Sequence, residues 1–478
     1  EAVARLAVLL GGGNAVVGRE GKGEGGLPIR PTEDDELEGG IPAVDEATLA
    51  RAEEMLREVL NSSSPGRVVA ERLDEIDALL PALLALNVRE ARERVHPGLV
   101  QSLEGVMGRV NGVNGTPKTT CLTTNGVTTS GKRAPARVLF VRPAGVGIPI
   151  RHTLAAEGLR SRGCVVALEA GVSAGVEAFE VIIAHRPHAD PSLMKALAQR
   201  VAMDVPLVVD VDLDFEQLPG NHAGQGFGLG TPEQARLYMA ALLMADAVLV
   251  SGEELAGMLR NRGHQVRVIP EGWSQGNRLW EKPSSPRHTI NLGLVAGQVE
   301  DVAPARRMIL RILREFPQTQ LVVVGNPQVY QLFEGLPEAR RLFLPLASAE
   351  DNFRDEDFPY LLGQVDILLA PMRQTPFNMT CSDRVLMEAG VRGIPWVASA
   401  VPAFTAWAEG GLIAHSPEEW YTLLHGLITD PTLRRDLGRA GKVQAAAREM
   451  SVIGEAWWEL VEAERRSTKN TKSTKEKA

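Results

Sequence analysis

The stretch DILLAPMRQTPFNMTCSDRVLMEAGVRGIPWVAS, residues 366–399, decides the fold of this 478-residue chain. It begins with an apolar strand at 366–370, continues through a polar loop, and enters an amphipathic helix expected at 382–391. Gly393 ends that helix, and a second apolar strand is expected at 395–399. Strands that are apolar along their whole length are buried on both faces, so the segment predicts one βαβ unit of a parallel sheet.

The same alternation of strands and helices extends outward in both directions. Upstream, the candidate strands are 137–141, 165–168, 181–184, 206–211, 247–250 and 266–269, with helices at 150–162, 191–202, 232–244 and 253–261. After a Pro-rich connector, further strands are expected at 290–295 and 320–324, and helices at about 302–315, 417–429 and 431–449. The sequence therefore predicts an α/β fold with two tandem Rossmann-like, doubly wound domains, 136–287 and 288–449, preceded by a helical segment.

Composition divides the remaining chain into regions of different character. They are a flexible acidic start (1–46), a helical segment (47–112), a Thr/Gly/Ser-rich linker (113–135), a closing helix (450–466) and a disordered basic tail (467–478). The helical segment has apolar stripes, but about 65 residues are marginal for an independent core. Its stripes are expected to be buried by self-association or by a partner protein, the alternative being that they fold back onto the two domains.

Overall composition excludes several classes of protein. Hydrophobic residues make up 44% and charged residues 23%, which is ordinary for a globular chain, and the net charge of −9 argues against a nucleic-acid binder. Cys121, Cys164 and Cys381 are too far apart for a disulfide framework or a metal cluster. No apolar run reaches the roughly 20 residues of a transmembrane helix.

The expected location is the cytoplasm, with peripheral association at the inner membrane face left open. The start at Glu1 is interpreted as truncated or processed.

Candidate ligand contacts follow the strands of the first domain, because open α/β sheets bind ligands beyond the carboxyl ends of their strands. Gly145 and Gly147 follow the first strand, where they let the backbone approach a ligand or simply form a tight turn. His185 and His188 follow the third strand. A histidine there can act as acid, base or hydrogen-bond donor, or can merely cap a loop.

Three aspartates alternate at the next strand end: Asp210, Asp212 and Asp214. A period of two places them on one face of an extended chain, where three like charges must be solvated, paired or functional. A metal site is conceivable, but no further ligands are apparent in the sequence.

The second domain carries the richest set of candidates. Gly297 permits a turn before a helix that starts with Glu300 and Asp301, which are capping carboxylates or ligand contacts. The helix after the 371–381 loop offers its N-terminus to a diphosphate, and Glu388, two turns along, can accept hydrogen bonds from a ribose.

Residues 366–399 resemble the donor-binding signature of GT-B glycosyltransferases, in particular bacterial and phage members of the glycosyl transferases group 1 superfamily. The matching features are a strand ending in Ala370-Pro371, the helix glutamate Glu388, and a Gly-Ile-Pro-like strand from Gly393 to Ser399. The segment 244–273, which contains VIPEG at 268–272, is similar to the end of the family's first domain. The resemblance covers about 136–466.

The resemblance implies a function and a set of site residues. The donor-binding candidates are Gly145, Gly147, Gly297, Asp301, Arg373, Phe377, Asn378, Ser382, Asp383, Arg384 and Glu388. The catalytic candidates are His185 and His188, and the acceptor-side candidates are Asp212 and Asp214. Three positions depart from the family pattern: Thr380 stands where a glutamate is common, and Cys381 and Val385 stand where lysines are usual.

The expected function is transfer of a sugar from a nucleotide-sugar donor to a glycan, lipid-linked or protein acceptor, most often with retention of anomeric configuration. No metal and no cofactor are expected, because the nucleotide-sugar is a substrate. Two alternatives stay open: a glycosyltransferase-like binding module that has lost catalysis, and a sugar-nucleotide epimerase on the same fold.

Overall fold

The computed structural model describes most of the two-domain region and part of the helical segment. The described residues are 46–62, 65–75, 135–171, 178–220, 222, 228–281, 288–295, 297–345 and 358–475, with side chains described no further than 466. The predictions for 1–45, 76–112 and 113–134 lie outside these residues. Within them, no helix is both long and apolar enough to cross a bilayer.

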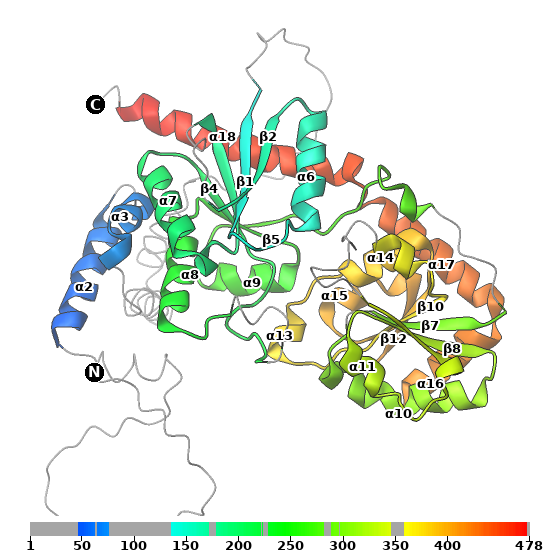
Figure 1. Ribbon diagram of the computed structural model, residues 1–478. Coiled ribbons are helices and arrows are strands. Elements are labelled where there is room, and N and C mark those ends of the chain that lie inside the picture. Colours follow the sequence, from blue (N-terminus) through cyan, green and yellow to red (C-terminus); the bar gives the residue numbers. More distant parts are fainter. Residues whose placement is uncertain are drawn as a thin grey trace, which may run out of the picture.

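The first domain is built on a parallel sheet with the strand order β2-β1-β3-β4-β5-β6 (Figure 1). Its strands are β1 (Arg137–Arg142), β2 (Val165–Ala170), β3 (Val181–His185), β4 (Leu207–Asp210), β5 (Ala247–Val250) and β6 (Val266–Val268). Its helices are α6 (Ile150–Ser161), α7 (Pro191–Ala202), α8 (Pro232–Met244) and α9 (Glu253–Asn261). The order reverses between β1 and β3, as in flavodoxin-like sheets.

The second domain has its own parallel sheet, in the order β12-β11-β10-β7-β8-β9. Its strands are β7 (Ile290–Val295), β8 (Thr319–Val324), β9 (Arg341–Leu344), β10 (Ile367–Ala370), β11 (Trp396–Ser399) and β12 (Gly411–Ala414). Its helices are α10 (Val299–Glu315), α11 (Pro327–Gln331), α12 (Phe358–Leu362), α13 (Pro376–Met379), α14 (Arg384–Arg392), α15 (Pro402–Thr405), α16 (Glu419–Thr429) and α17 (Pro431–Ala446). This is the Rossmann order, whose switch point lies between β7 and β10. The α/β fold of two tandem Rossmann-like domains is confirmed.

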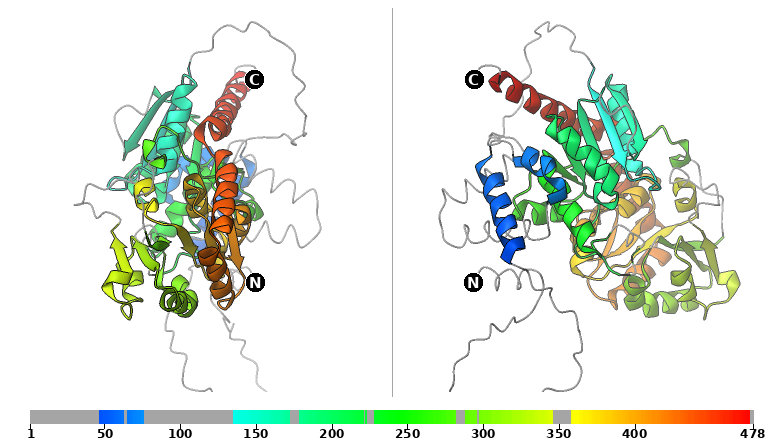
Figure 2. Two further views of the ribbon diagram at one scale, coloured as in Figure 1. Left: turned by 90° about the vertical axis from the view of Figure 1, so that its right-hand side faces the viewer. Right: turned by 60° about the vertical axis from the view of Figure 1, so that its left-hand side comes forward.

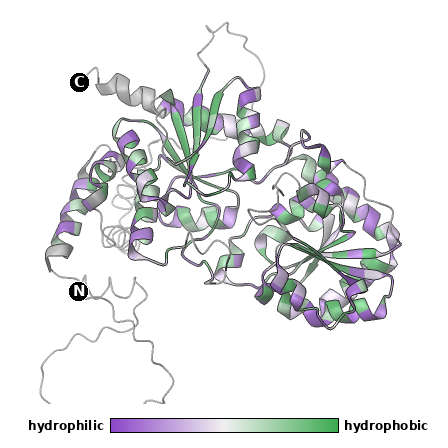
Figure 3. Cartoon of the chain, viewed as in Figure 1, coloured by the Kyte–Doolittle hydropathy of each residue, from purple (hydrophilic) through white to green (hydrophobic). Residues whose placement is uncertain are grey.

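Helices cover both faces of each sheet, which explains why the strands are apolar throughout (Figure 3). In the first domain α7, α8 and α9 pack on one face and α6 on the other. In the second domain α10 and α16 pack on one face, and α12, α14 and α15 pack on the other. All five residues of the central strand β3 are buried. Neither face of such a strand meets solvent, so neither face shows the alternating polar residues of a half-exposed strand.

The C-terminal helix α18 (Met450–Lys475) leaves the second domain and packs against the first (Figure 2). Ile453, Trp457 and Val461 enter the same core as Phe140 and Leu159 of the first domain. The helical backbone continues to Lys475, beyond the end at residue 466 that was predicted for the closing helix. A helix that crosses between the domains and packs on the first is the closing helix of a GT-B architecture.

Two helices of the N-terminal segment, α2 (Glu46–Asn61) and α3 (Pro65–Glu71), pack on the first domain (Figure 2): α3 lies against α7 and α8, and α2 lies against α3. Met55 and Val59 of α2 and Val69 of α3 are buried in the first-domain core. Arg236 of α8 also donates a hydrogen bond to the carbonyl of Leu73 at 2.8 Å. For residues 46–75 the expectation of burial by self-association is therefore wrong, and the alternative, folding back onto the domains, holds.

A buried carboxyl on the closing helix makes a pH-dependent prediction. Burial, and then the charge of Asp246, raise the pKa of Glu464 from 4.5 to about 7. A raised carboxyl pKa contributes stability that is present below pH 4.5 and is lost as the pH rises through 7. Glu464→Gln should therefore raise the free energy of unfolding at pH 8 by about 2 to 3 kcal/mol, and hardly change it at pH 4.5.

Urea denaturation of both proteins at the two pH values measures this difference. Glu459→Gln is the matched control, because Glu459 is exposed on the same helix and its replacement should change little at either pH. An equal effect of Glu464→Gln at both pH values would contradict the assignment.

Candidate functional site

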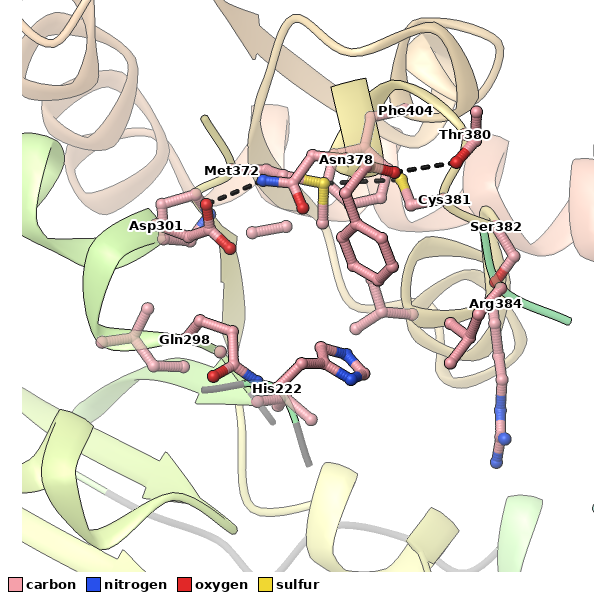
Figure 4. Close-up of a pocket in the computed structure, with 18 of the residues that line it drawn as sticks. His222, Gln298, Asp301, Met372, Asn378, Thr380, Cys381, Ser382, Arg384 and Phe404 are labelled. Atoms are coloured by element: carbon pink, nitrogen blue, oxygen red, sulfur yellow. Dashed lines mark hydrogen bonds between the residues drawn. The ribbon is translucent and has the colours of Figure 1, made fainter. Parts of the chain in front are cut away.

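A pocket of about 430 Å³ lies between the two domains, at the carboxyl ends of β7 and β10 (Figure 4). Leu294 of β7 and Ala370 of β10 form its floor, so it sits at the switch point of the second sheet, where α/β proteins bind ligands. Asp212, Asp214 and His222 reach it from the first domain. The site is thus assembled from both domains.

The loop after β10 is held in shape by a carboxylate on α10. Asp301 Oδ1 accepts hydrogen bonds from the Arg373 backbone N–H at 3.0 Å and from Asn378 Nδ2 at 2.8 Å. Asn378 Nδ2 also donates to the Arg373 carbonyl at 2.9 Å, and Thr375 caps the short helix α13. Asp301 and Asn378 line the pocket but bond to each other, so they position the loop and are not free donor contacts.

The helix α14 supplies the other wall of the pocket. Ser382 precedes it, and Arg384 and Glu388 on its first two turns line the pocket. Arg384 Nε donates to Glu388 Oε1 at 2.9 Å, and Glu388 is buried. An anion at this helix start would meet the positive end of the helix dipole as well as the Arg384 guanidinium.

Asp383 does not fulfil its predicted role. Its carboxylate accepts hydrogen bonds from Trp407 Nε1 and from Arg448 Nη2, the latter at 2.7 Å. Asp383 does not line the pocket, and its side chain ties the start of α14 to the segments that follow α15 and α17. The prediction of a donor contact failed here because a carboxylate at a helix start can face the protein as readily as a ligand.

The three departures from the family pattern all line the pocket: Thr380, Cys381 and Val385. Thr380 donates its hydroxyl to the Phe377 carbonyl at 2.8 Å. Burial raises the pKa of the Cys381 thiol to about 12, so the residue is a neutral thiol and not a nucleophile at neutral pH. This part of the wall carries no cation.

His222 is the pocket histidine, and the sequence interpretation missed it. Its ring meets Phe377 of the second domain edge-on, with ring centroids 5.1 Å apart. Figure 4 shows it across the pocket from Asn378 and Thr380. Burial, and then the charge of Arg186, lower the pKa of His222, which keeps its imidazole neutral at pH 7. The signal in the sequence was a histidine among turn residues, PGNHAG, shortly after the strand that ends at Asp210.

The two predicted catalytic histidines lie outside this pocket. His188 is 1% exposed and packs edge-on against Phe215 and Tyr238, at 4.7 and 5.1 Å between ring centroids. His185 is buried at the end of β3, with Nδ1 3.5 Å from Asp210 Oδ2. The assignment of both residues as contacts to the sugar or acceptor in this pocket is wrong, because each is covered by its own domain.

The three aspartates at the end of β4 do not all face the same way, contrary to the alternation prediction. β4 ends at Asp210, which turns into the domain and accepts a hydrogen bond from His152 Nε2 at 2.9 Å. Asp212 pairs with Arg186, whose Nε donates to it at 3.0 Å, and lines the pocket. Asp214 also lines the pocket and accepts from a backbone N–H. The extended conformation that the alternation assumed stops with the strand.

The glycine loop after β1 is exposed and does not line the pocket. Gly145 has a φ of +78°, a conformation that favours glycine, while a side chain at Gly147 would meet no neighbour within 4 Å. The tight-turn interpretation accounts for Gly145. Gly297, by contrast, does line the pocket, and its carbonyl accepts from Asn326 Nδ2 at 2.9 Å.

A second, smaller pocket of about 230 Å³ adjoins the first. It shares His222 and Phe377 with the larger one and is lined by Arg373, whose side chain is about half exposed. Arg373 Nε lies 3.6 Å from Asp301 Oδ1. Arg373 therefore lines the smaller pocket and Arg384 the larger one, and Phe377 lines both.

The chain was compared with protein-family models, curated proteins and solved structures. No protein-family model matches the chain, and no curated protein matches its sequence. Among solved structures it is similar to Anabaena HepE in complex with UDP and glucose, with 15% identity, a TM-score of 0.49, and coverage of 68% of this chain and 99% of that one. An E. coli structure described as trehalose-6-phosphate bound with UDP-2-fluoro glucose gives 10% identity, a TM-score of 0.49 and the same coverage. A putative UDP-N-acetylglucosamine 2-epimerase from Listeria monocytogenes gives 12% identity and a TM-score of 0.42, covering 67% of this chain and 94% of that one.

The topology of both sheets, the pocket between them and the crossing of α18 define an α/β protein of the GT-B architecture.

Proposed function

We propose that this chain is a glycosyltransferase that binds a nucleotide-sugar in the interdomain pocket and transfers the sugar to an acceptor approaching from the first domain. The observation that carries the proposal is the position of the pocket at the β7/β10 switch point, with the start of α14 in its wall. Switch points and helix N-termini are the places where α/β folds bind nucleotides and their phosphates.

Charge in the pocket gives the donor a defined orientation. Asp212, Asp214, Asp301 and Glu388 contribute carboxylates to the described lining, and Arg384 contributes a guanidinium. A diphosphate is therefore favoured only near α14, away from Asp212 and Asp214. Those two carboxylates suit sugar hydroxyls on the acceptor side, and Glu388 suits the ribose.

The leaving diphosphate would be stabilised electrostatically by the α14 dipole and Arg384, with Arg373 as a second cation from the adjoining pocket. His222, neutral and between the two pockets, is placed to exchange a hydrogen bond or a proton with the transferred sugar or the acceptor. The proposal includes retention of the anomeric configuration of the transferred sugar, and a transfer step that needs no metal ion.

A second candidate is a binding module that holds a nucleotide-sugar without transferring it. The wall at Cys381 and Val385 favours it, because neither side chain can neutralise a donor phosphate. A sugar-nucleotide epimerase is the third candidate.

A thermal-shift screen against UDP-, GDP-, ADP- and CDP-sugars identifies the nucleotide, since a ligand that binds only the folded chain raises its melting temperature. Product analysis with the selected donor then separates the candidates. Transfer or hydrolysis supports the enzyme, binding without turnover supports the module, and an epimeric donor supports the epimerase. No shift with any nucleotide-sugar would contradict the proposal.

Glu388→Ala should weaken nucleotide binding by about 1–3 kcal/mol, which is the scale for losing a hydrogen bond to a charged group. Calorimetric titration with the nucleotide found in the screen measures the change. Glu334→Ala, an exposed change on the same domain, should leave the affinity unaltered. Unchanged affinity in a folded Glu388→Ala protein would remove Glu388 from the donor site.

A further inference from the structure

A cluster of polar side chains is buried inside the first domain, behind the pocket. His152 stands in the first turn of α6, His185 at the end of β3, and Asp210 at the end of β4. Their side chains are 2%, 4% and 0% exposed. Three separate rigid elements thus bring two imidazoles and one carboxylate together at the carboxyl edge of the sheet.

The ligand atoms of the cluster converge. One ring nitrogen from each histidine and one carboxylate oxygen all lie within 4.8 Å of one another. His152 Nε2 is 2.9 Å and His185 Nδ1 is 3.5 Å from Asp210 Oδ2. Since metal–nitrogen and metal–oxygen bonds to zinc are about 2.0–2.2 Å long, atoms at these separations can share one ion after small side-chain shifts.

The hydrogen bonding of the cluster is incomplete without a further group. Among the described residues, His185 Nδ1 and Asp210 Oδ1 are buried and have no hydrogen-bond partner. Buried polar atoms in folded proteins are nearly always satisfied, so an unsatisfied nitrogen aimed at a carboxylate calls for a bound species.

Residues around the cluster are arranged as supports for metal ligands. Arg151 Nη2 lies 3.6 Å from Asp210 Oδ1, the oxygen that faces away from the imidazoles, and Arg151 is itself paired with Glu271 at 3.4 Å. The other ring nitrogen of His185, Nε2, lies 4.0 Å from Asp212 Oδ2. In metal sites, a carboxylate usually accepts a hydrogen bond from the ring nitrogen of the histidine that does not bind the metal. A metal-binding carboxylate is usually hydrogen-bonded as well.

We propose that His152, His185 and Asp210 bind one divalent transition-metal ion, of which zinc is the best match. Two imidazole nitrogens and one carboxylate oxygen suit Zn²⁺ or Co²⁺ and not Mg²⁺ or Ca²⁺, which prefer oxygen ligands alone. The site lies outside the interdomain pocket but is connected to it through Asp212, which lines the pocket and faces His185. No further ligand near these aspartates is apparent in the sequence, because His152 lies 58 positions away from Asp210.

The test uses the full chain, freed of metal by a chelator and then titrated separately with Zn²⁺ by calorimetry and with Co²⁺ by visible absorption. The expected result is one ion per chain, the d–d bands of a Co²⁺ site with imidazole ligands, and a higher melting temperature with zinc. His185→Gln and His152→Gln should each weaken binding at least about 100-fold and abolish those bands.

His185→Gln is the decisive variant, because His185 Nδ1 has no hydrogen bond to lose and the protein should stay folded, as circular dichroism can verify. His415→Gln and His425→Gln are matched controls for adventitious binding, since both histidines lie in the second domain, and they should bind the ion like the unaltered chain. Absence of binding, or binding that His185→Gln does not alter, would overturn the proposal. Neither result bears on nucleotide-sugar binding in the pocket, which is measured separately.

Discussion

Replacement of Trp457 by alanine is expected to lower the free energy of unfolding by about 3–5 kcal/mol, the range for removing a large buried aromatic side chain. Trp457 lies on α18 and is 1% exposed. Its ring contacts Phe140 of β1, with centroids 5.9 Å apart, and the Arg151 guanidinium lies 5.4 Å from its centroid. The substitution therefore removes the side chain that fastens the closing helix to the first domain.

Guanidinium denaturation followed by circular dichroism measures the loss. Val452→Ala is the matched control, because Val452 lies on the same helix but is 55% exposed, and it should change the stability by about 0.5 kcal/mol or less. A small effect of Trp457→Ala would mean that α18 is detached from the first domain in solution. The GT-B arrangement of the chain would then lose its closing contact.

Central strands were the most predictable part of the fold. Strands β5 and β7 were predicted at the residues where they occur, because runs buried on both faces are almost wholly apolar. The strands β9 and β12 were missed, and both are edge strands of the second sheet. With a neighbour on one side only, they are short and partly exposed, so Arg341–Leu344 and Gly411–Ala414 lack a long apolar run.

The second-domain wall of the pocket was more predictable than the first-domain wall. Much of it comes from the βαβ unit at 366–399, in which Arg384 and Glu388 are close because helical spacing makes them neighbours. Which way Asp383 points could not be predicted, because Trp407 and Arg448 are far away in the sequence.

The polar centre of the first domain depends on contacts that local spacing does not encode. Asp210 meets His152 and Arg151, which precede it by more than one strand and helix. The periodicity of apolar residues did not predict that Asp210, His152 and Arg151 are in contact. It indicates which face of a strand or helix a residue occupies, but not which distant segment packs on that face. His222 was missed for the same reason: its significance lies in its contact with Phe377 of the other domain.

Loss of Asp210 should have an effect as large as the loss of Trp457. The Asp210 side chain is fully buried and compensates the Arg151 guanidinium, which is 5% exposed. Asp210→Ala leaves Arg151 with Glu271 as its remaining carboxylate partner among the described residues, at 3.4 Å, and removes the acceptor of the His152 hydrogen bond. Breaking a buried pair from one side costs about 3–5 kcal/mol, and that loss is expected at pH 7 in the metal-free chain.

The pH dependence of this loss identifies its cause. Burial alone would raise the pKa of Asp210, but the charge of Arg151 and the imidazoles of His152 and His185 beside the carboxylate outweigh it and hold the pKa well below 3.8. A depressed carboxyl pKa contributes stability that is present above pH 3.8 and is lost as the pH falls toward the folded-state value. The stabilities of the unaltered chain and Asp210→Ala, measured by urea denaturation with chelator present, should therefore converge below pH 3.8.

Asp436→Ala, which removes the exposed partner of Arg439, is the control and should lower the free energy of unfolding by less than about 1 kcal/mol at any pH. A difference between Asp210→Ala and the unaltered chain that stays constant down to pH 3 would mean that lost packing, and not the buried carboxylate charge, destabilises the variant.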